Sequence, residues 1–376
     1  MSYLISILVF LVIFSILILV HEFGHFFAAR KAGVKVEEFG MGLPPRAKGL
    51  WKDKAGTLYS LNWIPFGGFV RMYGEDSEDD SLRNKEGSFS SKSIAARTII
   101  ILGGVIMNFL LGYVLLVILF TAGTKPFVVT QEDFQYYRSQ GIITAEDRIV
   151  ITDFADHSAA QKVGLQKNDL VQLVDGMAVK SNTEVISALK AAANKVAVIG
   201  VLRAKERLSF EVPINAEGKM GVVIADAPDI KEVKEIQLPL PQALVEAGYQ
   251  TGRLSWLTMK MFVSVIVDLF TKFELSSQVS GPVGIAQITH QTTQNGTFLD
   301  ILKLVALLSI SLGAINVIPI PALDGGRFLS IIFEVVTRRR PSASWEARIH
   351  AFGFLVILIL IVAVTFNDIA KLFAAN

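Results

Sequence analysis

The stretch that decides the fold is YLISILVFLVIFSILILVHEFGHFFAA, Tyr3 to Ala29. No Asp, Glu, Lys, Arg or His occurs before the motif HEFGH, His21 to His25, which still lies inside apolar sequence. About 20 apolar residues can cross the roughly 30 Å hydrocarbon core of a bilayer as a helix. Residues 1–29 are therefore expected to form a first membrane span. An acid such as Glu22 costs a few kcal/mol there, which indicates a functional role.

The pattern H-E-x-x-H implies a particular side-chain geometry when it lies in a helix. His21 and His25 are four residues apart, so both imidazoles face one side and can bind one Zn²⁺, with Glu22 beside the metal as a candidate general base. Zinc held by three protein ligands keeps a position for water and lowers the pKa of that water to about 7. A chance HExxH is common in soluble helices, but lipid offers no solvated face for three polar side chains.

A cleaved signal peptide is the alternative for this segment. Signal peptides carry a positive region before an apolar core of about 7 to 15 residues. Met1 to Leu4 contains no basic residue, the apolar run is longer, and Arg30 and Lys31 follow it. We therefore expect a permanent span whose C-terminal end is cytoplasmic.

The composition predicts a polytopic α-helical membrane protein with a soluble insert. The chain has 376 residues, of which 52% are hydrophobic, yet its middle part is rich in charge. Further spans are expected at 98–122, 298–323 and 349–376. The net charge of +2 gives no indication of nucleic acid binding, and the absence of Cys excludes thiolate ligands and disulfides.

Basic residues set the expected topology. Lys and Arg gather in residues 30–97 and again in residues 324–348, so the positive-inside rule makes both loops cytoplasmic. Four spans then place both termini and the insert outside the cytoplasm, in the inner membrane of a bacterial cell.

One further apolar segment, 254–273, could be a fifth span. It carries three charged residues and an amphipathic stripe, and a fifth crossing would move the end of the third main span to the opposite side from His25. We therefore expect an interfacial amphipathic helix, within an extracytoplasmic connector over residues 227–297.

Two histidines leave zinc in need of a third ligand. Asp324 belongs to NVIPIPALDGG, Asn316 to Gly326, at the cytoplasmic end of the third span and therefore at the depth of His25. Prolines and glycines break the helix there, and irregular backbone at membrane depth is tolerated only where it is buried or lines a cavity. We expect Asp324 to be the ligand, although a helix-end carboxylate in a polar turn is the alternative. The other candidates are His157, His290 and His350, of which the first two are expected on the outer side and the third at the start of the fourth span.

These two distant motifs, with a PDZ-like segment between them, resemble the site-2 protease family, in particular its bacterial regulator-of-sigma-E protease branch. The resemblance covers nearly the whole chain and implies zinc ligands His21, His25 and Asp324 with Glu22 as the catalytic base. It also implies that Asn316 holds the substrate backbone, for which bonding within a broken helix is the alternative.

A second-span motif of the family is similar to GGVIMNFLLG, Gly103 to Gly112. By resemblance alone it places Asn108 near the site as a further substrate-binding candidate. Small residues in such a span otherwise serve helix packing.

Residues 123–226 are expected to form one extracytoplasmic PDZ-like α+β domain, where the best-known members of the branch carry two in tandem. PDZ modules bind extended peptides by strand addition, which predicts a peptide ligand, and a spacer that excludes bulky substrates is the alternative. Strands are predicted at 148–152, 170–174, 195–202 and 208–214, and helices at 158–163 and 183–193.

The segment TLYSLNWIPFGGFVRMY, residues 57–73, is rich in β-formers and bends. We expect a membrane re-entrant β-hairpin whose strand edge holds an unwound substrate, as in the family, and an ordinary interfacial hairpin is the alternative.

The expected function is that of a zinc metalloendopeptidase in regulated intramembrane proteolysis, which cuts transmembrane proteins such as anti-sigma factors or signal-peptide remnants. A membrane-anchored PDZ scaffold with a structural zinc is a second hypothesis, but structural sites usually have four protein ligands, and three stand at one depth here. A metal transporter is a third hypothesis. It would need ionisable residues along several spans, and the predicted spans contain almost none outside the two motifs.

Overall fold

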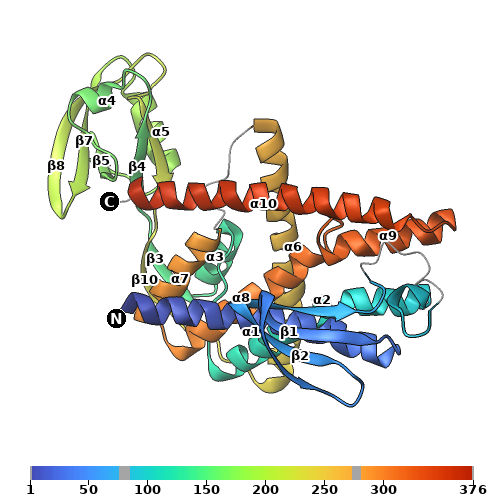
Figure 1. Cartoon of the computed structure of the whole chain (residues 1–376). Helices are drawn as coiled ribbons and strands as arrows, with labels where there is room; N and C mark the ends of the chain where they lie inside the picture. The colour runs from blue at the N-terminus through green and yellow to red at the C-terminus, as the bar shows by residue number, and fades with distance from the viewer. Residues whose placement is uncertain (1, 76–84, 273–280, 375–376) are drawn as a thin grey trace. The chain divides into compact units, whose positions relative to one another are not determined.

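The computed structural model describes residues 2–75, 85–272 and 281–374 (Figure 1). The chain divides into two compact units, of which unit 1 comprises Met1–Thr124 and Gln237–Asn376 and unit 2 comprises Lys125–Ile236. Within unit 1 the residues that precede and follow the insert are neighbours, because the Leu238 N–H donates to the Phe120 carbonyl at 2.8 Å. Unit 2 is therefore an insertion after the second long helix.

Four helices within the described residues are long and apolar enough to cross a membrane, as the sequence predicts. Large apolar side chains such as Leu8, Ile99 and Phe354 are exposed on them, which fits contact with lipid. The third ends at Val317 and not at the predicted residue 323, because the chain breaks at the prolines that follow. The four are α1 (Ser2–Lys31), α2 (Ile94–Ala122), α8 (Phe298–Val317) and α10 (Ala343–Ala374).

Close contact between α1 and α2 depends on glycine. A Cβ atom added to Gly24 would lie 2.7 Å from the backbone nitrogen of Gly104, and one added to Gly103 would lie 2.6 Å from the Gly24 carbonyl oxygen. Small residues let helix backbones approach in this way. On its other side α2 packs against α8, so α2 links the first and third apolar helices.

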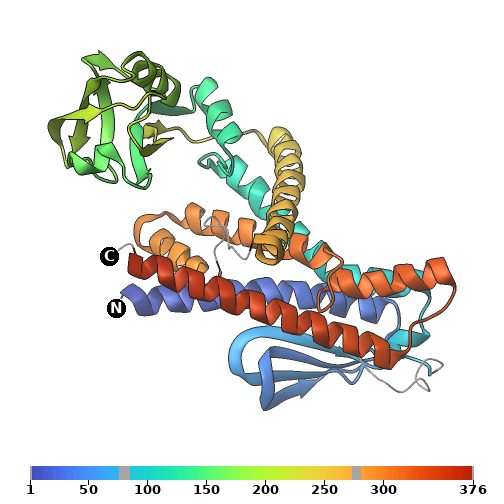
Figure 2. The same cartoon turned by 90° about the horizontal axis from the view of Figure 1, so that it is seen from above.

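A long helix, α6 (Leu240–Lys272), packs across α2 and α8 (Figures 1 and 2). It contains the predicted helix 254–273, except for Phe273, which lies outside the described residues, but it begins at Leu240. One face buries Ala243 and Ala247 against the apolar helices, and another exposes Tyr249 and Trp256. The next helix, α7 (Pro282–Asn295), begins where Gly281 and Gly284 donate backbone N–H groups to Asp368 of α10, at 2.9 and 2.7 Å.

The predicted hairpin confined to residues 57–73 is wrong in its pairing. That stretch forms one strand, β2 (Leu58–Met72), and its partner is the preceding strand β1 (Val36–Lys52). A short 3-10 helix, η2 (Phe89–Ser91), comes after β2 in the chain. Residues 38–41 of β1 pair with both ends of β2, residues 68–71 and residues 58–61.

Glycine makes this arrangement possible, because a Cβ atom on Gly40 would lie 2.7 Å from the Phe69 ring and 2.8 Å from the Asn62 amide nitrogen. Both ends of β2 therefore cover Gly40. The strand β1 was missed because its glycines and its Pro44-Pro45 pair indicate turns in the sequence.

Residues 324–348, expected to be a loop, instead contain the helix α9 (Asp324–Thr337). Its ion pairs fasten it to other parts of unit 1. Arg327 pairs with Glu75, and Glu334 pairs with Arg97 at the start of α2 at 2.8 Å.

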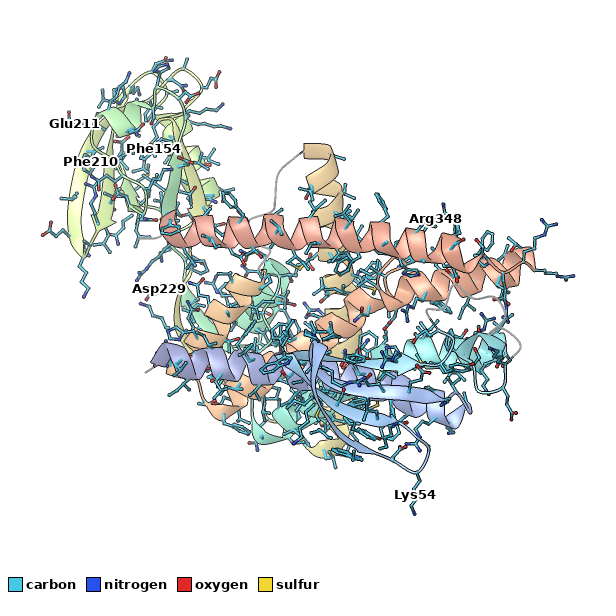
Figure 3. The ribbon with its side chains drawn as sticks, viewed as in Figure 1. Lys54, Phe154, Phe210, Glu211, Asp229 and Arg348 are labelled. Atoms are coloured by element: carbon cyan, nitrogen blue, oxygen red, sulfur yellow. The ribbon has the colours of Figure 1, made fainter. Side chains whose placement is uncertain are left out.

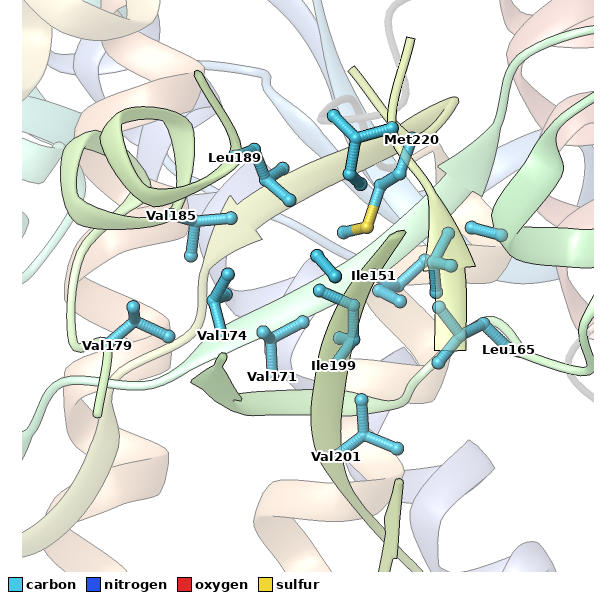
Figure 4. Packing of buried hydrophobic residues seen from close by; sticks show 14 of the residues in the cluster. Ile151, Leu165, Val171, Val174, Val179, Val185, Leu189, Ile199, Val201 and Met220 are labelled. Carbon is cyan, nitrogen blue, oxygen red and sulfur yellow. The ribbon is translucent and has the colours of Figure 1, made fainter. Parts of the chain in front are cut away.

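Unit 2 folds around a β-sheet with strand order β8-β7-β5-β4-β9, and the short strand β6 pairs with β5. Its core contains Ile151, Val174 and Ile199 (Figure 4), with Phe154 and Phe210 packed against them (Figure 3). The elements are α3 (Gln131–Ser139), β3 (Ile143–Glu146), β4 (Ile149–Phe154), α4 (Ala159–Lys162), β5 (Leu170–Val174), β6 (Met177–Ala178), α5 (Asn182–Ala191), β7 (Val196–Arg203), β8 (Glu206–Pro213), β9 (Val222–Asp226) and β10 (Asp229–Val233).

The four predicted strands and two predicted helices of the insert are present, and their ends differ from the predicted ones by no more than two residues. The unit extends past residue 226, the predicted domain boundary, because β10 pairs with β3 and the segment reaches Ile236.

Candidate metal centre

The helix α1 places two imidazoles side by side. His21 and His25 are four residues apart and nearly fully buried, and their Nε2 atoms lie 3.1 Å from each other. Each Nε2 atom faces the same point beside the helix. The spacing of HEFGH therefore has the geometric result that the sequence predicts.

Asp324 reaches the same point from the first turn of α9. Its Oδ2 atom lies 3.0 Å from His21 Nε2 and 3.4 Å from His25 Nε2. Residues 318–323 form the break between α8 and α9, with Ala322 at a φ of 79°. The Ala322 N–H donates to His350 Nδ1 at 2.9 Å, which ties the break to α10.

Two glycines let α9 start so close to this break. A Cβ atom on Gly325 would lie 2.6 Å from the Ile318 carbonyl carbon, and one on Gly326 would lie 2.8 Å from Pro321 Cα. Any larger residue would push the helix away and carry Asp324 with it.

The spacing of the three candidate ligand atoms fits one zinc ion. In tetrahedral zinc sites with bonds of about 2.0–2.2 Å, neighbouring ligand atoms are about 3.3 Å apart. The three separations here, 3.0, 3.1 and 3.4 Å, are close to that value. Two imidazole nitrogens and one carboxylate oxygen form the donor set of many zinc enzymes, and three protein ligands leave one position open. Among the described residues, His21, His25 and Asp324 are the group of His, Asp and Glu that could hold a metal.

The helix α2 supports both histidines. His25 donates its Nδ1–H to the Ile100 carbonyl at 2.8 Å, which leaves the Nε2 lone pair for the metal. The Asn108 amide nitrogen, Nδ2, lies 3.2 Å from His21 Nδ1. Gly104 is between them, and a Cβ atom there would lie 2.5 Å from His25 Nε2 and 2.8 Å from His21 Nε2. Sequence reasoning missed Ile100 and Gly104, although the paired glycines in an apolar run were a signal.

Glu22 is half-buried on α1 and faces the sheet. A Cβ atom on Gly68 would lie 3.8 Å from Glu22 Cγ, so this part of β2 runs directly beside the acid.

The remaining candidates lie elsewhere. Asn316 is half-buried in the last turn of α8. His290 is on α7, where its Nδ1 atom lies 2.8 Å from the Ser6 hydroxyl. His157 belongs to unit 2, and His350 belongs to α10, where it accepts from Ala322.

A helix-borne HExxH that meets a carboxylate from another apolar segment is the arrangement of a membrane metallopeptidase. The model of peptidase family M50 matches residues 9–360, and the chain belongs to this family, that of the site-2 proteases. The zinc metalloprotease RasP of Shouchella clausii is 27% identical over 98% of this chain and 100% of that protein. Putative zinc metalloproteases of Fusobacterium nucleatum and Clostridium perfringens are 28% and 30% identical, over 97% and 96% of this chain and 99% and 97% of those proteins.

The protein is therefore a zinc metalloendopeptidase of the site-2 protease type, and the four apolar helices among its described residues fit a multi-pass membrane protein.

Proposed function

We propose that His21, His25 and Asp324 hold the catalytic zinc and that Glu22 is the general base of an intramembrane endopeptidase. The observation that carries this assignment is the convergence of three ligand atoms, from α1 and α9, within 3.4 Å of one another. The two histidines and Asp324 lie about 300 positions apart in the chain, so a chance cluster is a poor explanation.

The chain's own residues supply the proton transfers. Bound Zn²⁺ provides a Lewis acid and a water of lowered pKa. Glu22 would take a proton from the attacking water as the oxygen of that water bonds to the scissile carbonyl carbon. The same carboxyl then gives the proton to the leaving nitrogen, so that one water is consumed and an acid and an amine are released.

The substrates are transmembrane segments of other membrane proteins, of the anti-sigma factor or signal-peptide-remnant type, cut in regulated intramembrane proteolysis. A transmembrane helix must unwind before attack, because its peptide bonds are hidden in internal hydrogen bonds. The part of β2 beside Glu22, around Gly68, binds such an extended segment by strand addition in this proposal. Exposed apolar side chains on the same sheet, such as Trp63 and Ile64, support a location in the membrane. Asn316 holds the substrate backbone.

The topology follows the charge distribution. The basic segments between α1 and α2 and around α9 are cytoplasmic, so both termini and unit 2 are outside, in a bacterial inner membrane. Unit 2 is a PDZ-like module that binds peptide tails or excludes bulky substrates. The edge strand β9, which pairs with β4 on one side, is available for strand addition.

The test is a Glu22→Gln variant of the full chain in detergent or liposomes. It is expected to keep one zinc per chain and to lose cleavage of a single-span test protein by about 10²- to 10⁴-fold, because a positioned base contributes a factor of that size. Chelation of zinc should abolish cleavage by the unchanged protein, and added zinc should restore it.

Glu132→Gln, an exposed acid at the start of α3, is the matched control and should cleave normally. Turnover retained by Glu22→Gln would exclude Glu22 as the base. Zinc retained by a protein that cleaves no membrane substrate would favour a scaffold.

A further inference from the structure

Asn108 lies behind the metal site and not in front of it. The residue is on α2 and fully buried, and its Nδ2 atom lies 3.2 Å from Nδ1 of His21. Nδ1 is on the opposite edge of the imidazole from Nε2, the atom that faces Asp324. A substrate bound at the open position of the metal therefore cannot reach Asn108 without displacing His21.

The amide can fix the tautomer of His21. An imidazole that binds metal through Nε2 carries its proton on Nδ1 and needs an acceptor there. The Asn108 amide offers an oxygen and a nitrogen that exchange places by a half-turn, and its Oδ1 atom has no hydrogen-bond partner among the described residues. With that oxygen toward His21, the Nδ1–H is satisfied and the Nε2 lone pair is available to the metal.

The geometry of α2 brings two hydrogen-bonding groups, the Ile100 carbonyl and the Asn108 side chain, to the same height along the helix. The Ile100 carbonyl points toward the C-terminal end of the helix, and the Asn108 side chain leans toward the N-terminal end. Both therefore reach the level of Gly104, where the two histidine rings lie. His25 donates to the Ile100 carbonyl, and His21 faces the Asn108 amide.

Asn108 is also fixed from α8. The hydroxyl of Ser309, itself fully buried, donates to the Asn108 backbone carbonyl at 2.8 Å. The same helix leads into the break before Asp324. The residue that orients one ligand is thus joined to the element that delivers another.

We propose that Asn108 is a positioning residue that holds His21 in its metal-binding orientation and makes no contact with substrate. The inference rests on the proposed zinc site. Outer partners of metal-binding histidines typically change metal affinity by about 10- to 100-fold.

The experiment measures zinc affinity of the full-length protein by competition with a chelator, and KM and kcat at saturating zinc. Asn108→Leu, which keeps the volume but removes the acceptor, should weaken zinc binding by about 10- to 100-fold and leave KM unchanged. Asn108→Asp, which restores an acceptor, should bind zinc at least ten times more tightly than Asn108→Leu. The matched variant Asn316→Leu should keep the affinity for zinc and raise KM.

Wild-type zinc affinity in Asn108→Leu, or a raised KM at saturating zinc, would overturn the proposal. If Asn108→Leu does not fold, ¹⁵N NMR of the unchanged zinc-loaded protein decides, because the proposal requires His21 to carry a proton on Nδ1. An unchanged protein that binds no zinc would overturn the proposed metal site itself, so the two failures are distinguishable.

Discussion

At the scale of single residues, the geometry of the candidate metal centre depends on glycines, which leave space for neighbouring groups. His21 and His25 need room to turn their Nε2 atoms toward Asp324, and Gly104 of α2 provides it. Gly24 and Gly103 bring the two helix backbones close enough for the Ile100 carbonyl to accept from His25. The positions of the two proposed ligands therefore depend on glycines of the facing helix as much as on their own helix.

A substitution at Gly104 tests this dependence. In Gly104→Ala the new methyl group would stand 2.5 Å from His25 Nε2, a distance that real Cβ contacts do not show, so both rings must move. We expect zinc affinity to fall at least 10-fold and cleavage to be lost, as measured by metal analysis and a cleavage assay.

Gly252→Ala on α6 is the control, because nothing lies within 4 Å of its added Cβ atom. It should keep zinc and stabilise the helix by about 0.5–1 kcal/mol. Equal zinc binding by the two variants would show that Gly104 is not needed for space.

At the scale of elements, α9 is the part that must be held, since Asp324 is in its first turn. Glu334 near its other end pairs with Arg97 at 2.8 Å and Arg340 at 2.6 Å. Burial alone would raise the pKa of Glu334, but the hydrogen bonds and charges of the two arginines together lower it. A carboxyl whose pKa is lower in the folded protein stabilises the fold above its unfolded pKa and loses this effect in acid.

The free energy of unfolding of Glu334→Gln at neutral pH should therefore be lower by about 2 kcal/mol, since a hydrogen bond to a charged group contributes an amount of that order. The difference from the unchanged protein should be full at pH 7 and should shrink as the pH falls below about 4.3, the usual pKa of Glu. Thermal unfolding in detergent from pH 7 to pH 3.5 measures it. A difference that is independent of pH would mean that the ion pairs do not matter.

At the scale of the whole molecule, the chain leaves unit 1 and returns to it at one place. Besides the bond from Leu238 to Phe120, the side chain of Gln237 donates to the Thr121 carbonyl at 3.1 Å. Unit 2 has its own core of Ile, Val and Leu side chains, so each unit has what it needs to fold.

Replacement of residues 125–236 by a short Gly/Ser linker should thus leave unit 1 folded with one zinc bound, because the two ends to be joined are neighbours. The expressed segment 125–236 should unfold cooperatively on its own. Metal analysis and thermal unfolding of the two pieces check this. Loss of zinc from the shortened protein would show that unit 2 is needed to form the centre.

The sequence determined the local features of this protein. Apolar length predicted the four helices in the described part of the chain that are long enough to span a membrane. The period of HEFGH put two histidines on one face, and alternation with turn residues marked the strands of unit 2. These features depend on neighbours within a few residues, so a single segment contains the information. The prolines of NVIPIPALDGG predicted the break before Asp324 for the same reason.

Tertiary structure alone decided which distant segments meet. The partner of β2, the start of α6 at Leu240, the helix α9 and the contact of Asn108 with His21 all depend on packing between parts far apart in the chain. No local sequence pattern predicts that two parts of β2 cover Gly40 or that Gly104 faces two imidazoles. A glycine is required at these positions only because distant segments pack against it, and that packing is a property of the tertiary structure.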